Sequence, residues 1–469
     1  MVAPREGAPN AAAMLADRFR VRLRQGFEWL DPTKQRALTA LGIRVTGAAI
    51  AYFMQILLAQ WMGLTEYGVF VGVWVWLLVL GGIAPLGLNV SVIGLLSTFH
   101  DAGTFDRWRG LIVSSVTMAM AASLVIAGIG WGIVHLEPDL FSPQYLMPVW
   151  LCLFCVPLMT LSEMNEGISR AHGWMNTSLL PTYILRPLLL IGGCLCLLWA
   201  GVDLTATTAM ATAIAACLAT VLLQGTVMLV RLRRLGGEGG YSATPWTWLL
   251  ASLPIVVAQA FDLITQNFDL IAVSYFLGPE AAGVYFAALK TIALLAYVNF
   301  AVGAATANKV ASLHASGDRD ELASALGGAV NLAFWPTLAG AILLVLLAPY
   351  LLELFGREFV AHSHLTIVLA AGFLAKAFVG PAELYLNVLG QQKICALTLL
   401  LAAALNMVLN IALIPYMGLL GAAIATSVSL TVLAGSLHWI ARRRLGVSLR
   451  PAMPVLSWRR CREQKLGAR

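Results

Sequence analysis

The sequence predicts an all-α, polytopic membrane protein of about twelve transmembrane helices, arranged in two parallel lobes of six helices each. Composition is the first observation behind this prediction: 59% of the 469 residues are hydrophobic and 11% are charged, whereas soluble proteins carry about 25% charged residues. So few charges cannot cover the chain with a solvated surface, so its apolar surface must face lipid. The 42 Gly and 14 Trp are typical of membrane helices and their interfaces. This excludes a soluble enzyme, and the net charge of +7 indicates topology rather than nucleic-acid binding.

Twelve apolar runs are the second observation, because a helix needs about 20 apolar residues to cross the hydrocarbon core. We place the first six spans at 38–60, 67–92, 110–134, 146–169, 178–200 and 206–230. The last six are placed at 248–275, 282–308, 326–350, 363–388, 395–414 and 418–440. The span at 248–275 is the most polar of the twelve.

The distribution of Lys and Arg is the third observation, and it predicts the orientation. Cytoplasmic loops are enriched in Lys and Arg. Of the 30 Lys and Arg, four lie within the spans and only Arg357 lies in the loops opposite to the N-terminus. All others lie on the side of the N-terminus, so both termini are expected in the cytoplasm. The predicted domains are a basic tail (1–37), an N-terminal lobe (38–230), a cytoplasmic linker (231–247), a C-terminal lobe (248–440) and a second basic tail (441–469).

The first tail has apolar residues at helical spacing between arginines, namely Leu15, Phe19, Leu23, Phe27 and Leu30. This pattern is typical of an amphipathic helix that lies on the anionic inner leaflet, so membrane lipids are expected partners. A disordered basic tail is the open alternative.

An internal repeat predicts the two-lobed arrangement. The stretch MGLTEYGVF (62–70) aligns with LGPEAAGVY (277–285), about 215 residues later. His100 and Gly103 are matched by His314 and Gly317 at nearly the same separation. Six spans in each half would enter the membrane in the same direction, so the halves are expected to be parallel repeats. A substrate would lie at the seam between them.

Three segments resemble polysaccharide flippases. LAQWMGLTEYGVF (58–70) and SYFLGPEAAGVYFAALK (274–290) resemble their Leu-Gly-x-x-x-Tyr-Gly signature, although Met62 stands where Leu is usual. LNMVLNIALIPYMGLLGAAIATSVSL (405–430) resembles their Asn…Ile-Pro-x-x-Gly-x-x-Gly-Ala-Ala pattern. These proteins belong to the multidrug/oligosaccharidyl-lipid/polysaccharide (MOP) flippase superfamily, whose members share a MATE-like fold. The chain is most similar to the Wzx-type branch for O-antigen and exopolysaccharide.

The resemblance implies a function. A Wzx-type flippase in the bacterial inner membrane moves undecaprenyl-pyrophosphate-linked oligosaccharide from the inner to the outer leaflet by alternating access. It also implies a polysaccharide polymerase or ligase as a partner, and no nucleic acid. A drug/cation antiporter of the same superfamily is the first alternative. An integral-membrane glycan polymerase or ligase is the second, although the short outer loops leave little room for its acceptor.

Four cations inside the spans are candidate substrate contacts, since a charge in the membrane costs at least about 2.5–3.5 kcal/mol. Together they would form a cationic cavity for a pyrophosphate. The alternatives are pairing with a buried carboxylate and snorkelling to the headgroups. The four cations are Arg44, Arg186, Lys290 and Lys376. We expect Arg186 and Lys376 to matter most.

The acidic residues suggest ion coupling and gating. Asp262 and Asp269 are two helical turns apart and therefore share a helix face; such carboxylates bind H⁺ or Na⁺ in secondary transporters. The alternative is that one of them neutralises Arg44 or Lys290. Three glutamates near cytoplasmic span ends are gate candidates that could pair with Arg170, or ordinary interface residues: Glu163, Glu166 and Glu383.

No cofactor, metal or catalytic residue is expected. The sequence has no GxxxxGK[ST] phosphate loop, so energy would come from an ion gradient or from mass action. Cys152 and Cys155 form a CxxC inside an apolar run, where buried cysteines act as small apolar residues.

Overall fold

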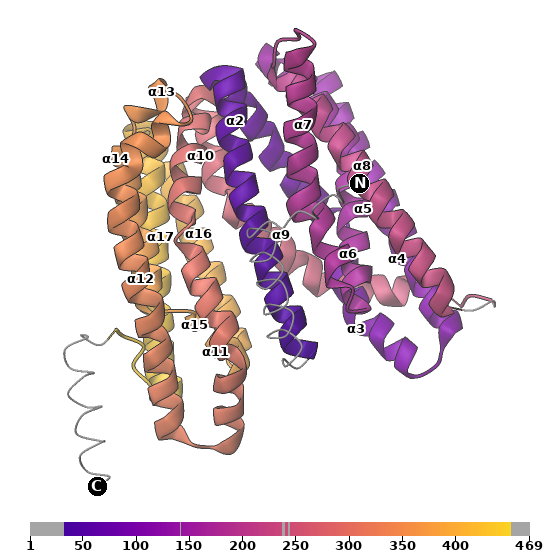
Figure 1. Cartoon of the computed structure of the whole chain (residues 1–469), viewed down its shortest axis with the longest axis vertical. Helices are drawn as coiled ribbons and strands as arrows, with labels where there is room; N and C mark the ends of the chain where they lie inside the picture. The colour runs from indigo at the N-terminus through magenta and orange to yellow at the C-terminus, as the bar shows by residue number, and fades with distance from the viewer. Residues whose placement is uncertain (1–31, 141, 237–239, 243, 452–469) are drawn as a thin grey trace, which may run out of the picture.

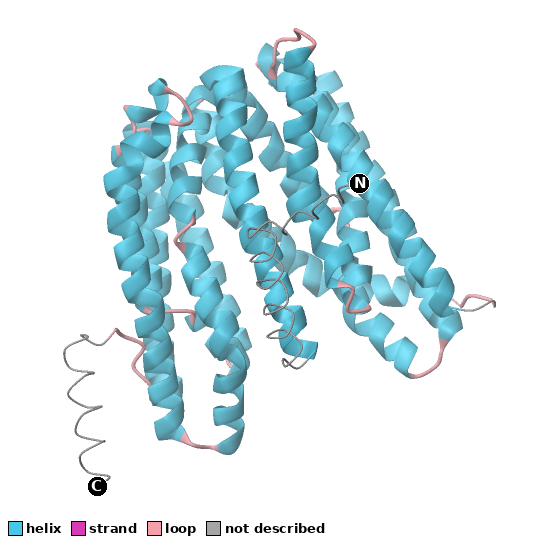
Figure 2. Ribbon diagram, viewed as in Figure 1, coloured by secondary structure: helices cyan, strands magenta, loops and turns pink. Residues whose placement is uncertain are grey.

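The computed structural model describes residues 32–140, 142–236, 240–242 and 244–451. Within these ranges all regular structure is helical (Figure 2). Eleven of the described helical segments are long and apolar enough to cross a membrane. Most of the two predicted tails, residues 1–31 and 452–469, lies outside the described residues.

Six of the described crossing segments are single helices, and five are assembled from shorter pieces. The long helices are α2 (Pro32–Ile83), α4 (Phe105–Leu136), α5 (Pro143–Ala171), α8 (Ala206–Gly236), α9 (Pro245–Leu277), α12 (Arg319–Glu353), α16 (Gln392–Met417) and α17 (Leu419–Ile440). The shorter helices are α3 (Leu88–Asp101), α6 (Met175–Leu180), α7 (Arg186–Trp199), α10 (Pro279–Ala293), α11 (Ala296–Ser316), α13 (Arg357–Val360), α14 (His364–Phe378) and α15 (Ala382–Val388).

The first crossing segment contains two of the predicted spans. Thr39–Asp101 has 63 residues, which would make a straight helix of about 95 Å, about three times the thickness of the hydrocarbon core. Gly63, with φ 75° and ψ 173°, breaks the helical path of α2, so this segment supplies two crossings. The prediction of an all-helical bundle with about twelve crossings is therefore confirmed.

Glycines in left-handed conformations mark the internal repeat in the backbone. Gly63 and its repeat partner Gly278 have φ values of 75° and 84°. Gly103 and Gly317, which also match in the repeat, have φ values of 67° and 76°. Side chains other than Gly adopt this region only with strain, so the repeated glycines place equivalent turns in the two halves.

The chain forms two lobes (Figure 1). In the N-lobe (32–236), α5 packs against α2, α4 and α8; in the C-lobe (245–451), α17 packs against α14 and α16. Helix α9 contacts α2 and α3 as well as α10 and α16, so it bridges both lobes. The join is shorter than the predicted linker at 231–247, because α8 continues to Gly236 and α9 begins at Pro245.

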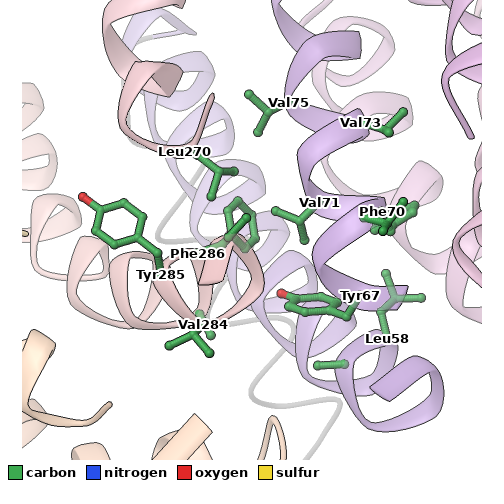
Figure 3. Packing of buried hydrophobic residues seen from close by; sticks show 14 of the residues in the cluster. Leu58, Tyr67, Phe70, Val71, Val73, Val75, Leu270, Val284, Tyr285 and Phe286 are labelled. Atoms are coloured by element: carbon green, nitrogen blue, oxygen red, sulfur yellow. The ribbon is translucent and has the colours of Figure 1, made fainter. Parts of the chain in front are cut away.

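The lobes meet along a seam between α2 and α10. A Cβ atom at Gly68 would collide with the carbonyl oxygen of Pro279, and one at Gly283 would lie 3.3 Å from the Gly68 Cα. Only glycines allow the two helices to approach so closely. Figure 3 shows the apolar layer beside this contact, with Val284, Tyr285 and Phe286 on one side and Tyr67 and Val71 on the other.

Two faces of the bundle are distinguished by their turns. We call the proximal face the one where α2 begins, with turns near Gly103, Gly173, Gly317 and Gly390. The distal face carries the turns near Gly63, Gly201, Gly278, Gly356 and Gly418 and is at the top in Figure 1. Helix α10, in the distal half, packs closely on α2, whereas α11, in the proximal half, hardly contacts it.

Gly167 permits close packing inside the N-lobe, and its replacement by valine is expected to destabilise the protein by about 1–3 kcal/mol. A Cβ atom there would collide with the backbone oxygen of Asn89 on α3. Thermal unfolding in detergent measures the effect. Gly132→Val is the matched control, because nothing lies within 4 Å of that position. Equal melting temperatures for the two variants would contradict this packing.

Candidate functional site

The distal half of the seam is closed by polar and aromatic contacts. The ring of Tyr67 packs against Phe355 and Phe359, with centroids 6.4 and 6.1 Å away. Four hydrogen bonds join the lobes: Thr65 Oγ1 to Glu280 Oε1 (2.8 Å), Gln60 Nε2 to the Leu354 carbonyl oxygen (2.8 Å), Tyr145 OH with Ser274 Oγ (3.0 Å) and Tyr52 OH with Thr291 Oγ1 (2.9 Å).

Lys290 lies where this closed part of the seam ends. It follows Gly283 by about two helical turns and therefore lies on the same face of α10, the face directed at the N-lobe. Residues 282–288 of that helix are buried, but Lys290 is exposed. The Lys290 side chain is thus accessible at this depth, although the neighbouring Thr291 still bonds Tyr52 across the seam. The Lys290 Nζ lies 5.0 Å from the centroid of the Phe286 ring.

Arg44 lies on α2 about two helical turns nearer to the proximal face than Tyr52. Its guanidinium carbon lies 5.7 Å from the ring centroid of Tyr183 in the N-lobe and 5.6 Å from that of Phe300 in the C-lobe. Arg44 thus touches both lobes through cation–π contacts. Within the described part of the chain, neither Arg44 nor Lys290 has an ion-pair partner.

Arg170 and two glutamates lie near Arg44 at the proximal end of the N-lobe. Arg170 forms an ion pair with Glu166 on the next turn of α5. It also interacts electrostatically with Arg44 and Glu163. Glu163 accepts a hydrogen bond from Asn89 Nδ2 at 3.3 Å. The predicted pairing partner of Glu166 is present in the structure, whereas the gating role stays a prediction.

The structure does not bring the four predicted cations together. Arg186 is 7% exposed and lies inside the N-lobe, where it donates to Ser162 Oγ at 2.6 Å. Lys376 forms an ion pair with Glu383 at 3.0 Å within the C-lobe, so Glu383 is paired with this lysine rather than with Arg170. The burial of Arg186 inside the N-lobe does not support a single cavity lined by all four cations, which stays a prediction. The contacts place Arg44 and Lys290 at the seam, and Arg186, one of the two cations expected to matter most, inside the N-lobe.

The two predicted carboxylates of α9 differ in their surroundings. Asp269 is 6% exposed and accepts hydrogen bonds from Tyr285 (3.1 Å) and Thr426 (2.7 Å), on α10 and α17. Asp262 is exposed and accepts from Gln266 Nε2 at 2.7 Å. Neither aspartate has an ion pair in the described residues, so neutralisation of Arg44 or Lys290 is not what the structure contains.

Two asparagines of α16 lie at the same depth as Asp269, counted from the distal face. Asn410 Nδ2 donates to Asn406 Oδ1 at 3.0 Å, and both residues are buried. The Oδ1 atom of Asn410 has no hydrogen-bond partner. Since α16 packs against α9 and α17, these amide groups and Asp269 all lie in the interior of the C-lobe.

Sequence reasoning missed the aromatic contacts of the cations and the hydroxyl partners of Asp269. The motif that contains Tyr285 is part of the internal repeat, but a repeat does not predict that this tyrosine donates a hydrogen bond to a carboxylate. Thr426 lies in the segment 405–430, which resembles polysaccharide flippases, but that resemblance does not predict its hydrogen bond to Asp269. Tyr183 and Phe300 gave no signal, because aromatic residues are common in membrane helices.

Comparisons with known proteins agree with this architecture. The MatE family model matches residues 254–412, in the C-lobe. An uncharacterized membrane protein of Methanocaldococcus jannaschii is 29% identical over 178 residues, which cover 37% of this chain and 34% of that protein. The chain therefore matches about a third of the length of that relative.

Two solved structures share the overall fold. An inward-facing multidrug resistance MATE family transporter of the MOP superfamily is 16% identical, with a TM-score of 0.69 over 87% of this chain and 94% of that one. The lipid II flippase MurJ, in an inward closed conformation, is 14% identical, with a TM-score of 0.69 over 86% and 87%. At these identities the likeness establishes the fold: this is a multi-pass membrane protein with a MATE-like fold.

Proposed function

We propose that the protein is a flippase that moves undecaprenyl-pyrophosphate-linked oligosaccharide from the cytoplasmic to the periplasmic leaflet of a bacterial inner membrane. The product would serve the synthesis of a surface polysaccharide, by a polymerase or ligase that acts on the outer face. The observation that carries the proposal is a pair of cations at the seam, Arg44 and Lys290, which have no carboxylate partner among the described residues.

The chemistry of these cations suits a pyrophosphate. Arg offers a planar fork of donors that matches two phosphate oxygens, and Lys offers a mobile point charge. Charge-assisted hydrogen bonds of this kind are roughly twice as strong as neutral ones. The two side chains project from α2 and α10, so one anionic group between them would contact helices of both lobes.

Alternating access follows from the asymmetry of the seam. Hydrogen bonds across the lobes close the distal half as far as Thr291, whereas α11, in the proximal half, hardly contacts α2. The excess of Lys and Arg on the proximal side favours that side as cytoplasmic. This conformation would receive substrate from the inner leaflet, and rocking of the lobes would present it to the outer leaflet.

Asp269 is the proposed binding site for a coupling cation, H⁺ or Na⁺. We expect Asp269→Asn to remove the dependence of transport on the ion gradient, because the buried carboxylate is then neutral in every state. Transport driven by the substrate gradient should remain. Vesicles with and without an imposed Na⁺ or pH gradient measure this dependence.

Asp262→Asn is the control for that experiment, since Asp262 is exposed on the same helix. It should keep the response to the gradient. A normal gradient response in Asp269→Asn would exclude Asp269 as the coupling group.

The second candidate function is a drug/cation antiporter. It is favoured by Asp262, an exposed carboxylate without an ion pair in the described residues, next to Leu263, which meets Gly82 of the N-lobe. A carboxylate at the seam would attract a cationic substrate. In that case Asp262→Asn should abolish transport, whereas neutralising Arg44 and Lys290 should leave it intact.

Deletion of the gene separates the two functions. Radiolabelled sugar is used to quantify lipid-linked oligosaccharide and surface polysaccharide in the mutant. A flippase predicts loss of surface polysaccharide and accumulation of single lipid-linked repeat units, both restored by the gene on a plasmid. Unchanged polysaccharide with increased sensitivity to cationic drugs would overturn the proposal in favour of the antiporter.

A further inference from the structure

Arg186 has a buried charge that no carboxylate in the described residues neutralises. Only 7% of the residue is exposed. Its Nη2 donates to Ser162 Oγ at 2.6 Å, and its Nη1 lies 3.3 Å from the thioether sulfur of Met159. The Nε atom has no hydrogen-bond partner. This guanidinium has only one hydroxyl and one weak sulfur acceptor, and one of its donors is unused. Its burial therefore costs free energy unless an anion accompanies it.

The local backbone fixes this side chain inside the lobe. Residues Pro181–Leu185 form a π-helical turn, and the Arg186 amide donates to the Pro181 carbonyl oxygen. A π-helical turn inserts an extra residue and rotates the next part of the helix about its axis; such turns are frequent at functional sites. Arg186 is the first residue after the turn, and it points toward α5.

More hydrogen-bond donors without acceptors lie on the same helices. Helix α5 runs antiparallel to the segment of α6 and α7, with Ser162 opposite Arg186. One turn further along both helices, this register places Asn165 at about the depth of Thr182, and the Nδ2 atom of Asn165 lies 3.6 Å from where a Cβ atom on Gly225 of α8 would stand. The Nδ2 atom of Asn165 and the hydroxyl of Thr182 are buried and have no hydrogen-bond partner among the described residues. Three unused donors therefore lie at neighbouring levels inside the N-lobe.

The neighbouring groups do not supply the missing negative charge. Glu166, which lies on α5 beside Asn165, forms an ion pair with Arg170. The thiols of Cys155 and Cys217 contact each other and also interact with Arg186. The amide oxygen of Gln224 is an unused acceptor nearby, but it is neutral and leaves the charge of Arg186 uncompensated.

We propose that the N-lobe binds a small monovalent anion of the halide class at Arg186, Thr182 and Asn165. The anion accepts from the Nε of Arg186 and from its two neighbours and neutralises the buried guanidinium. It lies inside the N-lobe and apart from the seam, so it is a structural ligand rather than transported substrate. The inference does not depend on which substrate the protein carries.

Halide-dependent stability tests the proposal. The purified full-length protein is melted in sodium gluconate and in increasing sodium chloride or bromide at constant ionic strength. Chloride and bromide should raise the melting temperature of the wild type in a saturable manner, by a shift on the order of 2 °C. Arg186→Met should abolish the shift. Arg44→Met, which removes an equal charge at the seam, should retain it.

Two further experiments keep the test decisive if Arg186→Met does not fold. Arg186→Lys keeps the charge and should retain a weakened halide shift. Crystals grown in bromide should show an anomalous scattering peak within hydrogen-bond distance of Arg186. A melting temperature that does not respond to halide, or equal shifts in the wild type and Arg186→Met, would overturn the proposal.

Discussion

Replacing Gly68 by valine is expected to lower transport about ten-fold or more while the protein still inserts in the membrane. A side chain at this position collides with Pro279 where α2 meets α10, and overpacking of this kind costs about 1–3 kcal/mol. The collision exists only when the distal half of the seam is closed. Since each 1.4 kcal/mol is about ten-fold in an equilibrium, the variant should be trapped with its distal side open.

Cysteine labelling measures this trapping. In a protein without its native cysteines, Ser274→Cys replaces a residue that bonds Tyr145 across the closed seam. A membrane-impermeant maleimide added from the periplasmic side should label this cysteine faster in Gly68→Val than in the parent. Gly94→Val is the control, because nothing lies within 4 Å of Gly94. Normal transport by Gly68→Val would show that the distal seam does not need to close.

Neutralising Arg44 and Lys290 together is expected to reduce transport of a pyrophosphate-linked substrate about a hundred-fold. A hydrogen bond to a charged group contributes about 1.5–3 kcal/mol, so each replacement by glutamine should lower transport about ten-fold or more. Lys290→Arg keeps the charge and should retain much of the activity. Arg44→Lys should recover only part, because the lysine lacks the planar fork. Transport into vesicles, normalised to the amount of inserted protein, measures these differences.

The control for the double variant removes two charges away from the seam. Arg319 and Lys393 are exposed at the starts of α12 and α16 on the proximal face, so Arg319→Gln with Lys393→Gln changes the net charge equally. This control should transport normally. If both double variants lose the same activity, the total charge matters rather than the two seam positions.

The sequence was sufficient to predict the helical bundle and its repeat. Apolar length alone sets where a chain can cross a membrane, and the repeated glycines before and after the spans gave the register of the two halves. Both Gly63 and Gly278 were visible in the motif, and both are turns with a positive φ.

The direction of each charged side chain around its helix could not be predicted. Arg186 and Lys290 occur in similarly apolar runs, yet one lies inside a lobe and the other at the seam. Helices that are apolar on all sides have no polar face to indicate which side meets lipid, the lobe interior or the seam. The π-helical turn before Arg186 adds a rotation that a regular helical period does not contain. Hydrogen-bond partners from other helices, such as Thr426 for Asp269, depend on tertiary packing alone.

The most direct test of the proposed function is a translocation assay with the purified protein in lipid vesicles. A prenyl-pyrophosphate-linked oligosaccharide with a fluorescent sugar is placed in both leaflets, and an impermeant quencher reports the fraction that reaches the outer one. We expect the wild type to exchange the labelled lipid between the leaflets much faster than protein-free vesicles do. Exchange should be slow with Gly68→Val or with the Arg44 and Lys290 double variant. Exchange no faster than in protein-free vesicles, in a preparation that exports a cationic drug, would contradict the proposed function.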